Sequence, residues 1–185
     1  MRIAITGSSS TGKTTLVKAL LKHDQFNLKI KSFLNVDARS LLGKMGFQSM
    51  DLMNREQLKI FQLEYFKNKR EVELGNDDYI TDRSFVDVAA YWKQRDTLDQ
   101  PTIEQDRLIA PCREEASKYN LHIYLPFGLF KFESDGYRSD DNDLHNRIDA
   151  QIKLYLKCWE LRYITLNTAD IQERVEISLR AIEAL

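Results

Sequence analysis

The chain has 185 residues, of which 43% are hydrophobic and 30% are charged, and its formal net charge at pH 7 is −1. This hydrophobic content indicates a globular fold and excludes a disordered chain, and the length suggests one domain with a substantial core. A net charge so close to zero excludes a global basic field that would collect nucleic acid, so a polyanionic partner would have to meet a local basic patch.

The cysteines, Cys112 and Cys158, are far apart and show no metal-binding spacing. We therefore expect no disulfide framework, and a reducing compartment is the default. The sequence shows no leader in which a charged region is followed by an apolar stretch, and no apolar run that approaches membrane-spanning length. These features predict a soluble cytoplasmic protein, or one of the host cytoplasm if the chain is viral, without a membrane partner. The oligomeric state stays open.

In the first half of the chain, hydrophobic periodicity predicts short strands that alternate with helices. The expected elements, in chain order, are a strand at 2–6, a helix at 13–22, a strand at 28–36, a helix at 37–46 and a long amphipathic helix at 54–74. The apolar face predicted for the long helix comprises Leu58, Phe61, Leu63, Tyr65, Phe66 and Val72. We interpret its aromatic residues as core rather than as a stacking platform.

The second half continues the same alternation. The expected elements are a strand at 78–82, a helix at 84–95, a second helix, a strand at 121–126, a polar segment at 127–143, a helix at 143–158, a strand at 162–166 and a last helix. The helix after 84–95 is expected to begin with a capping box at Thr102 and Gln105 and to end near Tyr119. Asp170 and Glu173 are expected to cap the last helix. Such alternation predicts an α/β fold, a three-layer sandwich whose five-stranded parallel sheet has helices on both faces.

Three polar clusters follow predicted strands, at 7–14, 37–39 and 82–84. Ligands of such sheets bind at the carboxyl ends of the strands, so we expect these clusters to converge on one site.

The first cluster reads GSSSTGKT, which matches the whole phosphate-binding loop pattern. Gly7 and Gly12 permit backbone angles that let N–H groups point inward as an anion nest, and the next helix adds the positive end of its dipole. Lys13 would reach the β- and γ-phosphates, and the hydroxyl of Thr14 would bind Mg²⁺. The strand–loop–helix context favours this interpretation over an ordinary Ser/Gly-rich turn. The residues predicted to contact the nucleotide are Gly7, Ser8, Ser9, Ser10, Thr11, Gly12, Lys13, Thr14 and Thr15.

The third cluster follows the strand in YITDRS. Asp82 ends a strand expected beside the first one, so we predict that it holds Mg²⁺, in many such sites through water. Arg83 lies on the same edge, where it could clamp a phosphate or the substrate. The alternative is a capped strand end with a surface ion pair.

The second cluster leaves two interpretations open. Asp37, with Arg39 close by, could accept the proton of an acceptor hydroxyl or hold that hydroxyl in line. Asp37 would serve equally well as the N-cap of the helix that follows.

The polar segment carries Arg138 and is followed by Arg147, among many carboxylates. Its place after the fourth strand suits a lid that excludes water and brings arginine to the transferring phosphate, and the alternative is a solvated loop. Tyr91 and Trp92 are candidates to line a pocket for a planar base. His23, His122 and His145 have no ligand spacing, which favours packing or surface positions.

Taken together, GSSSTGKTTL, DAR after the second strand, TDRS..D.AAYW, YLP and DGYRS......RID resemble the small P-loop kinases related to the ribosylnicotinamide kinase domain. That group belongs to the nucleoside and thymidylate kinase assemblage, and the resemblance runs from about residue 2 to about residue 182. It implies ATP with Mg²⁺, Asp82 and Arg83 at the chemistry, and Arg138 and Arg147 in a lid. The group usually has a glutamate, one methylene longer, where this chain has Asp37. Similar kinases of bacterial viruses phosphorylate a hydroxymethylated uracil within DNA.

The sequence therefore predicts a single P-loop kinase domain over 1–185, with a lid at approximately 127–147. Its expected activity is ATP-dependent transfer of the γ-phosphate to a hydroxyl of a nucleoside- or nucleotide-type acceptor. The alternatives are a phage-type kinase acting on 5-hydroxymethyluracil in DNA, and a P-loop ATPase or nucleotide-dependent switch without a small acceptor. The near-zero net charge and the acidic stretch at 133–143 favour a small acceptor over DNA that carries a modified base.

Overall fold

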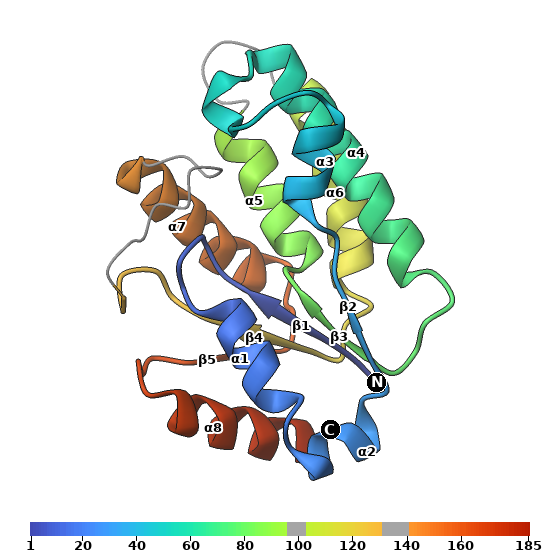
Figure 1. The fold of residues 1–185 in the computed structure, drawn as a ribbon, viewed down its shortest axis with the longest axis vertical. Helices are drawn as coiled ribbons and strands as arrows, with labels where there is room; N and C mark the ends of the chain where they lie inside the picture. The colour runs from blue at the N-terminus through green and yellow to red at the C-terminus, as the bar shows by residue number, and fades with distance from the viewer. Residues whose placement is uncertain (96–102, 131–140) are drawn as a thin grey trace.

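The computed structural model describes residues 1–95, 103–130 and 141–185, and its centre is one open sheet (Figure 1). The strands lie in the order β2-β3-β1-β4-β5, and every neighbouring pair is parallel. The strand bounds are β1 Arg2–Thr6, β2 Ser32–Leu34, β3 Tyr79–Asp82, β4 Leu121–Tyr124 and β5 Tyr163–Thr165. The five-stranded parallel sheet expected from the sequence is confirmed.

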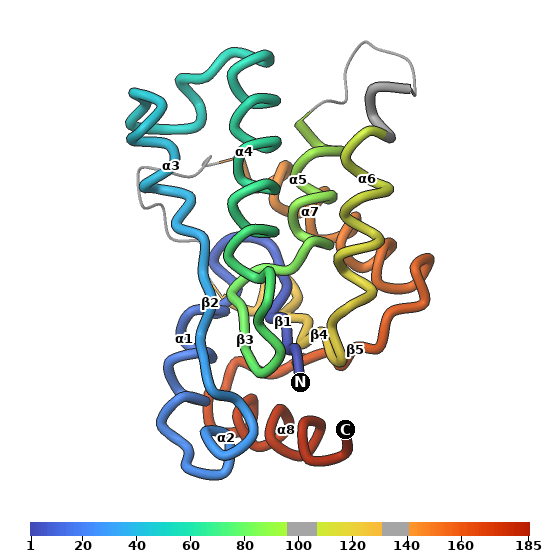
Figure 2. The backbone as a smooth tube through the Cα atoms, turned by 90° about the vertical axis from the view of Figure 1, so that its right-hand side faces the viewer, coloured from blue at the N-terminus to red at the C-terminus, as the bar shows by residue number. Residues whose placement is uncertain are grey.

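Helices cover both faces of the sheet, with α1 and α8 on one side and α4 to α7 on the other (Figure 2). The helix bounds are α1 Lys13–Leu20, α2 Asp24–Lys29, α3 Ala38–Lys44, the 3-10 turn η1 Met50–Leu52, α4 Arg55–Glu73, α5 Phe85–Arg95, α6 Ile103–Ala116, α7 Asn142–Cys158 and α8 Ile171–Glu183. None of the described helices is long and apolar enough to span a bilayer.

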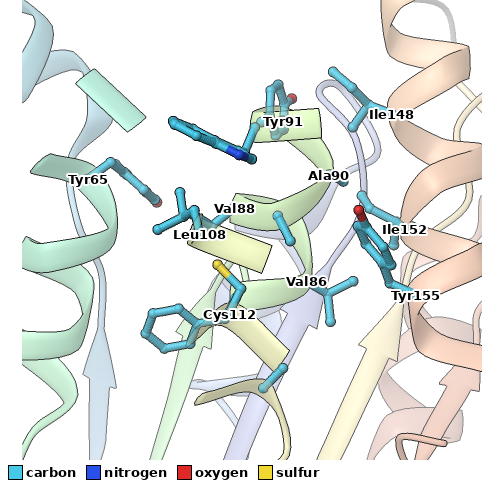
Figure 3. Packing of buried hydrophobic residues seen from close by; sticks show 14 of the residues in the cluster. Tyr65, Val86, Val88, Ala90, Tyr91, Leu108, Cys112, Ile148, Ile152 and Tyr155 are labelled. Atoms are coloured by element: carbon cyan, nitrogen blue, oxygen red, sulfur yellow. The ribbon is translucent and has the colours of Figure 1, made fainter. Parts of the chain in front are cut away.

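The alternation of side chains along β1 divides the core in two. Ile3 and Ile5 are fully buried against Leu16 and Leu20 of α1, whereas Ala4 belongs to the larger cluster on the opposite face. In that cluster α5 lies between α6 and α7, and Figure 3 shows its side chains surrounded by those of its neighbours. This burial on all sides fixes the position of α5, which carries several residues of the candidate site.

The strand predicted at 28–36 is wrong over its first half. Residues up to Lys29 belong to α2, which the buried ring of Phe26 anchors to the core, and only Ser32–Leu34 pair with β3. This stretch is too short for its hydrophobic periodicity to distinguish a turn of helix from a strand, so the sequence pattern misassigned it. Thr102, half of the predicted capping box, lies outside the described residues, and α6 ends at Ala116 rather than near Tyr119.

The face predicted for the long helix is also partly wrong, because α4 buries a charged pair. Lys69 and Glu73 are 1% and 8% exposed and form an ion pair of 2.5 Å, while the predicted core residue Val72 is exposed. Glu73 also accepts hydrogen bonds from the hydroxyls of Tyr79 and Tyr119 at 2.9 and 2.8 Å. These partners compensate the burial of both charges, which a hydrophobicity pattern cannot anticipate.

His122 on β4 makes stability depend on pH. The imidazole is fully buried, its Nε2 bonds the carbonyl of Ala116 at 3.1 Å, and its Nδ1 has no partner among the described residues. Burial lowers the pKa of His122 to about 4. Because the unfolded chain takes up this proton near pH 6.5 and the folded chain does not, stability falls as the pH drops from 6.5 towards 4.

We expect this histidine to account for a loss of about 3 kcal/mol in the free energy of unfolding over that window. His122→Gln keeps a donor for the carbonyl and should flatten the dependence, whereas His23→Gln, at an exposed position, should leave it unchanged. Urea unfolding at a series of pH values measures both. An unchanged slope in His122→Gln would refute the assignment.

Candidate active site

The loop between β1 and α1 has the backbone conformation that an anion nest requires. Gly7 has φ +154° and Gly12 has φ +84°, values that side chains disfavour. A Cβ on Gly7 would lie 2.5 Å from the carbonyl oxygen of Leu125, so the loop passes against the end of β4. Gly12 precedes α1 without a side-chain cap, which leaves the N–H groups at the start of that helix directed toward the loop.

Lys13 lies inside this loop and is 7% exposed. Its ammonium donates to the carbonyl of Ser8 and lies 3.3 Å from the hydroxyl oxygen of Thr11. Burial, and then the charge of Arg83, lower the pKa of Lys13 to about 8. A phosphate bound in the loop would supply the negative charge that this buried cation lacks.

Thr14 and Asp82 meet at the edge where β1 and β3 end side by side. The hydroxyl of Thr14 donates to Oδ2 of Asp82 at 2.6 Å, and the buried Oδ1 has no partner in the described part of the chain. Together they offer the hard oxygen ligands that Mg²⁺ requires. No group of three His, Cys, Asp or Glu side chains gathers among the described residues.

The carboxylate of Asp87, the second D of the motif TDRS..D.AAYW, connects the two loops, a role that the sequence did not predict. It accepts hydrogen bonds from the hydroxyl of Thr6 at 2.5 Å, from the N–H of Gly7 at 3.0 Å, and from the N–H and hydroxyl of Ser84 at 2.8 and 3.0 Å. The side chain is 1% exposed. An acidic residue within the otherwise apolar run FVDVAAYW was the available signal, because an isolated charge on a buried helix needs a specific set of partners.

Arg83 is held in an unusual conformation beside this network. Its φ is +74°, and its backbone N–H donates to the carbonyl of Ile5 at 2.9 Å. The guanidinium carbon lies 5.0 Å from the centroid of the Tyr91 ring, and the hydroxyl of Tyr91 bonds Ser9 at 2.9 Å. Burial acts against ionisation of Tyr91, but Arg83 and Lys13 outweigh it and lower the pKa to about 8. Backbone strain at such a residue is typical of functional sites.

These residues border a cavity of about 520 Å³ between the loop and helices α3, α4, α5 and α7. The residues that line it are Ser9, Ala38, Met50, Phe61, Gln62, Tyr65, Arg83, Asp87, Val88, Tyr91, Arg95, Leu144 and His145. Tyr91 therefore borders the cavity as the sequence suggested, whereas Trp92 belongs to the hydrophobic core.

The structure places the other predicted residues less centrally. Asp37 is exposed and is the N-cap of α3, where it accepts from the N–H of Arg39 at 2.9 Å. Its cap function is confirmed, while a part in the chemistry stays a prediction. Arg147 on α7 is exposed and lies 3.8 Å from Asp141, and Arg138 lies outside the described residues.

Arg174 on α8 stabilises the phosphate-binding loop through a hydrogen bond to its backbone, and the sequence did not predict this contact. Its Nη1 donates to the carbonyl of Thr11 at 2.8 Å and its Nε to the carbonyl of Thr168 at 2.6 Å. The guanidinium carbon lies 4.8 Å from the ring centroid of Phe130, and the residue is 1% exposed. A regular amphipathic pattern conceals such a residue, because the apolar positions of the last helix, such as Val175 and Ile182, already account for its buried face.

Comparison with known proteins identifies a family and a fold. A family model described as an AAA domain matches residues 2–174. The chain is a member of this family. No curated protein sequence matches it.

Solved kinases share the fold at low sequence identity. The NadR protein in complex with NR is 18% identical with a TM-score of 0.67, and the match covers 99% of this chain and 50% of that one. The chain thus spans about half of the NadR chain. Deoxyadenosine kinase from M. mycoides (14% identical, TM-score 0.67) is matched over 100% of this chain and 99% of that one. Thymidylate kinase from Ehrlichia chaffeensis (14% identical, TM-score 0.64) is matched over 98% of both. The resemblance to the small P-loop kinases is confirmed at the level of the fold.

The loop geometry predicts that Gly7→Ala loses both stability and nucleotide binding. The added Cβ would meet a backbone oxygen, and alanine disfavours this φ, so we expect a loss of at least about 2 kcal/mol in the free energy of unfolding. Gly43 on α3 is the matched control, because a Cβ added there would meet no neighbouring atom within 4 Å and alanine favours helices. Urea unfolding and calorimetric titration with ATP measure both properties. Normal stability and binding in Gly7→Ala would contradict the geometry.

Proposed function

We propose that the protein is an ATP-dependent kinase that transfers the γ-phosphate to a hydroxyl of a nucleoside- or nucleotide-type acceptor. The observation that carries the proposal is the Thr14–Asp82 pair, which lies beside the phosphate-binding loop and leaves one buried carboxylate oxygen without a hydrogen-bond partner among the described residues. A loop that only bound nucleotide would not need the adjoining cavity. We further propose that residues 1–185 form one such domain, with the lid at about 127–147.

We propose a role for each polar side chain that the sequence predicted at the phosphates and the metal. The N–H groups of residues 7–15 and the ammonium of Lys13 hold the phosphates, and Thr14 with Asp82 holds Mg²⁺. Bound ATP with Mg²⁺ supplies the electrophilic γ-phosphoryl group. Arg83, fixed beside the loop, stabilises the charge on the transferring group, and Arg138 and Arg147 are the proposed lid cations.

The acceptor occupies the cavity in this proposal, where the surrounding helices exclude water from the reaction. Phe61 and Tyr65 line it with apolar surface, and Gln62 supplies a buried amide. Asp37 lies next to the lining residue Ala38, so it is the proposed group that orients the acceptor or takes its proton. The names of two similar solved structures, a deoxyadenosine kinase and a thymidylate kinase, contain small nucleoside-type acceptors, which supports an acceptor of this class.

Label transfer tests the proposal. The protein is incubated with γ-labelled ATP, Mg²⁺ and a panel of nucleosides, nucleotides, ribosylnicotinamide and duplex DNA containing 5-hydroxymethyluracil. We expect label in one class of small acceptor. Label only in the DNA would replace the small-acceptor proposal with the DNA kinase, and label released only as inorganic phosphate would make the protein an ATPase.

Lys13→Ala should leave the fold intact and lower turnover on the order of 10²-fold or more, because it removes a fixed charge from the phosphates. Lys18→Ala, an exposed lysine on the same helix, is the control and should turn over normally. Steady-state rates and circular dichroism measure the two effects. Near-normal turnover in a folded Lys13→Ala protein would reject the role of the loop.

Asp82→Asn keeps the shape of the side chain and weakens its hold on the cation. Turnover should fall, and the Mg²⁺ concentration that gives half the maximal rate should rise. Rates over a Mg²⁺ series provide the measurement. If the variant is active and its Mg²⁺ dependence does not change, the metal is bound by other residues.

A further inference from the structure

Two arginines approach one tyrosine ring inside the cavity. The guanidinium carbons of Arg83 and Arg95 each lie 5.0 Å from the ring centroid of Tyr91, and all three residues line the cavity. Arg83 lies in the turn between β3 and α5, and Arg95 is the last residue of α5. The two arginines therefore lie at opposite ends of this helix. Both cations are therefore within reach of one small ligand.

Each arginine has a buried N–H group that is not compensated. The Nη1 atoms of Arg83 and Arg95 are buried without a hydrogen-bond partner among the residues that the structure describes. Nη1 of Arg83 forms a long ion pair of 3.9 Å with Asp87, beyond hydrogen-bond distance, and the oxygens of Asp87 already accept from Thr6, Gly7 and Ser84. Buried donors of this kind call for a specific explanation, and a ligand is one.

Arg95 is the more informative of the two. Its Nη2 contacts the sulfur of Met50 at 2.8 Å, and a thioether is a weak acceptor. Burial lowers the pKa of Arg95 to about 10. Asp87, the sole carboxylate among the described lining residues, lies beside Arg83, and the charge of Asp51, outside the lining, offsets only part of the effect of burial on Arg95. A guanidinium in this position is stabilised by an anion that enters with the ligand.

We propose that the acceptor enters this cavity as an anion, a nucleoside monophosphate whose phosphate binds Arg83 and Arg95. The inference rests on the proposed function and names the charge class of its acceptor. A phosphate presents several oxygens to planar guanidinium groups, which can bind it in bidentate fashion. The aromatic and amide side chains of α4, from Phe61, Gln62 and Tyr65, line the remaining part of the cavity for the nucleoside.

The same arrangement discriminates against other acceptors. A neutral nucleoside leaves both buried N–H groups unpaired, and a site built to bond a polar group rejects the analogue that lacks it. A ligand with a positively charged ring, such as ribosylnicotinamide, meets two cations in a low-dielectric cavity and is repelled. The chain should therefore differ in specificity from NadR, whose structure was solved with NR.

Calorimetric titration tests the proposal without requiring catalysis. The nucleotide site is first saturated with a non-hydrolysable ATP analogue and Mg²⁺, so that added monophosphate cannot occupy the phosphate-binding loop. Thymidine, deoxyadenosine, deoxycytidine, their 5′-monophosphates and ribosylnicotinamide are then titrated separately. We expect at least one monophosphate to bind about 10- to 100-fold more tightly than its nucleoside. Equal affinities within every pair, or tightest binding of ribosylnicotinamide, would overturn the proposal.

Arg95→Gln should abolish the preference for the monophosphate and leave the affinity for the ATP analogue unchanged. Arg95→Lys keeps the charge without the planar fork and should retain an intermediate preference. Arg113→Gln makes the same chemical change at an exposed position of α6 and should behave as the wild type. A folded Arg95→Gln protein that keeps the full preference would reject the site, and the wild-type affinity ratio decides the question if that variant does not fold.

The outcomes also separate this inference from the kinase reaction. Preferential binding of a monophosphate without transfer of label supports the anion site and rejects the reaction. Transfer of label to a nucleoside that binds as tightly as its monophosphate supports the reaction and rejects the anion site.

Discussion

The carboxylate of Asp87 is the constraint on which the candidate site depends. It is buried and accepts hydrogen bonds from Thr6 and Gly7 at the end of β1 and from Ser84 after β3. The phosphate-binding loop and the turn that carries Asp82 and Arg83 are thereby fixed to each other through one side chain. Removal of such a group would leave several buried donors unsatisfied at once, so its effect would reach every residue of the site.

Strand order and helix packing extend this constraint to the cavity. β3 lies between β2 and β1, so the three polar clusters follow neighbouring strands, and α5 begins directly at the Asp87 network. Because α6 and α7 pack on either side of α5, the helix holds its residues Tyr91 and Arg95 at the wall of the cavity. A preorganised charge of this kind binds an anion without the cost of reordering side chains.

The sequence predicted the parts of this structure that local patterns encode. The phosphate-binding loop, the alternation of strands and helices, and Asp82 at a strand end beside β1 all depend on short motifs or on periodicity. Long-range polar partnerships could not be predicted in this way. The burial of Lys69 with Glu73, the support of the loop by Arg174, and the contact of Arg95 with Tyr91 each require knowledge of which distant residues meet. For the same reason the sequence could not decide whether Asp37 acts on the acceptor hydroxyl or only caps a helix.

In the proposed reaction, phosphoryl groups leave ATP for an organic acceptor rather than for water. Phosphorus NMR of the protein with ATP, Mg²⁺ and a candidate acceptor measures this partition directly, since it resolves ADP, inorganic phosphate and the phosphorylated acceptor in one sample. We expect one phosphorylated acceptor for each ADP formed, with little inorganic phosphate. Inorganic phosphate formed in equal amount to ADP, whatever the acceptor supplied, would contradict it.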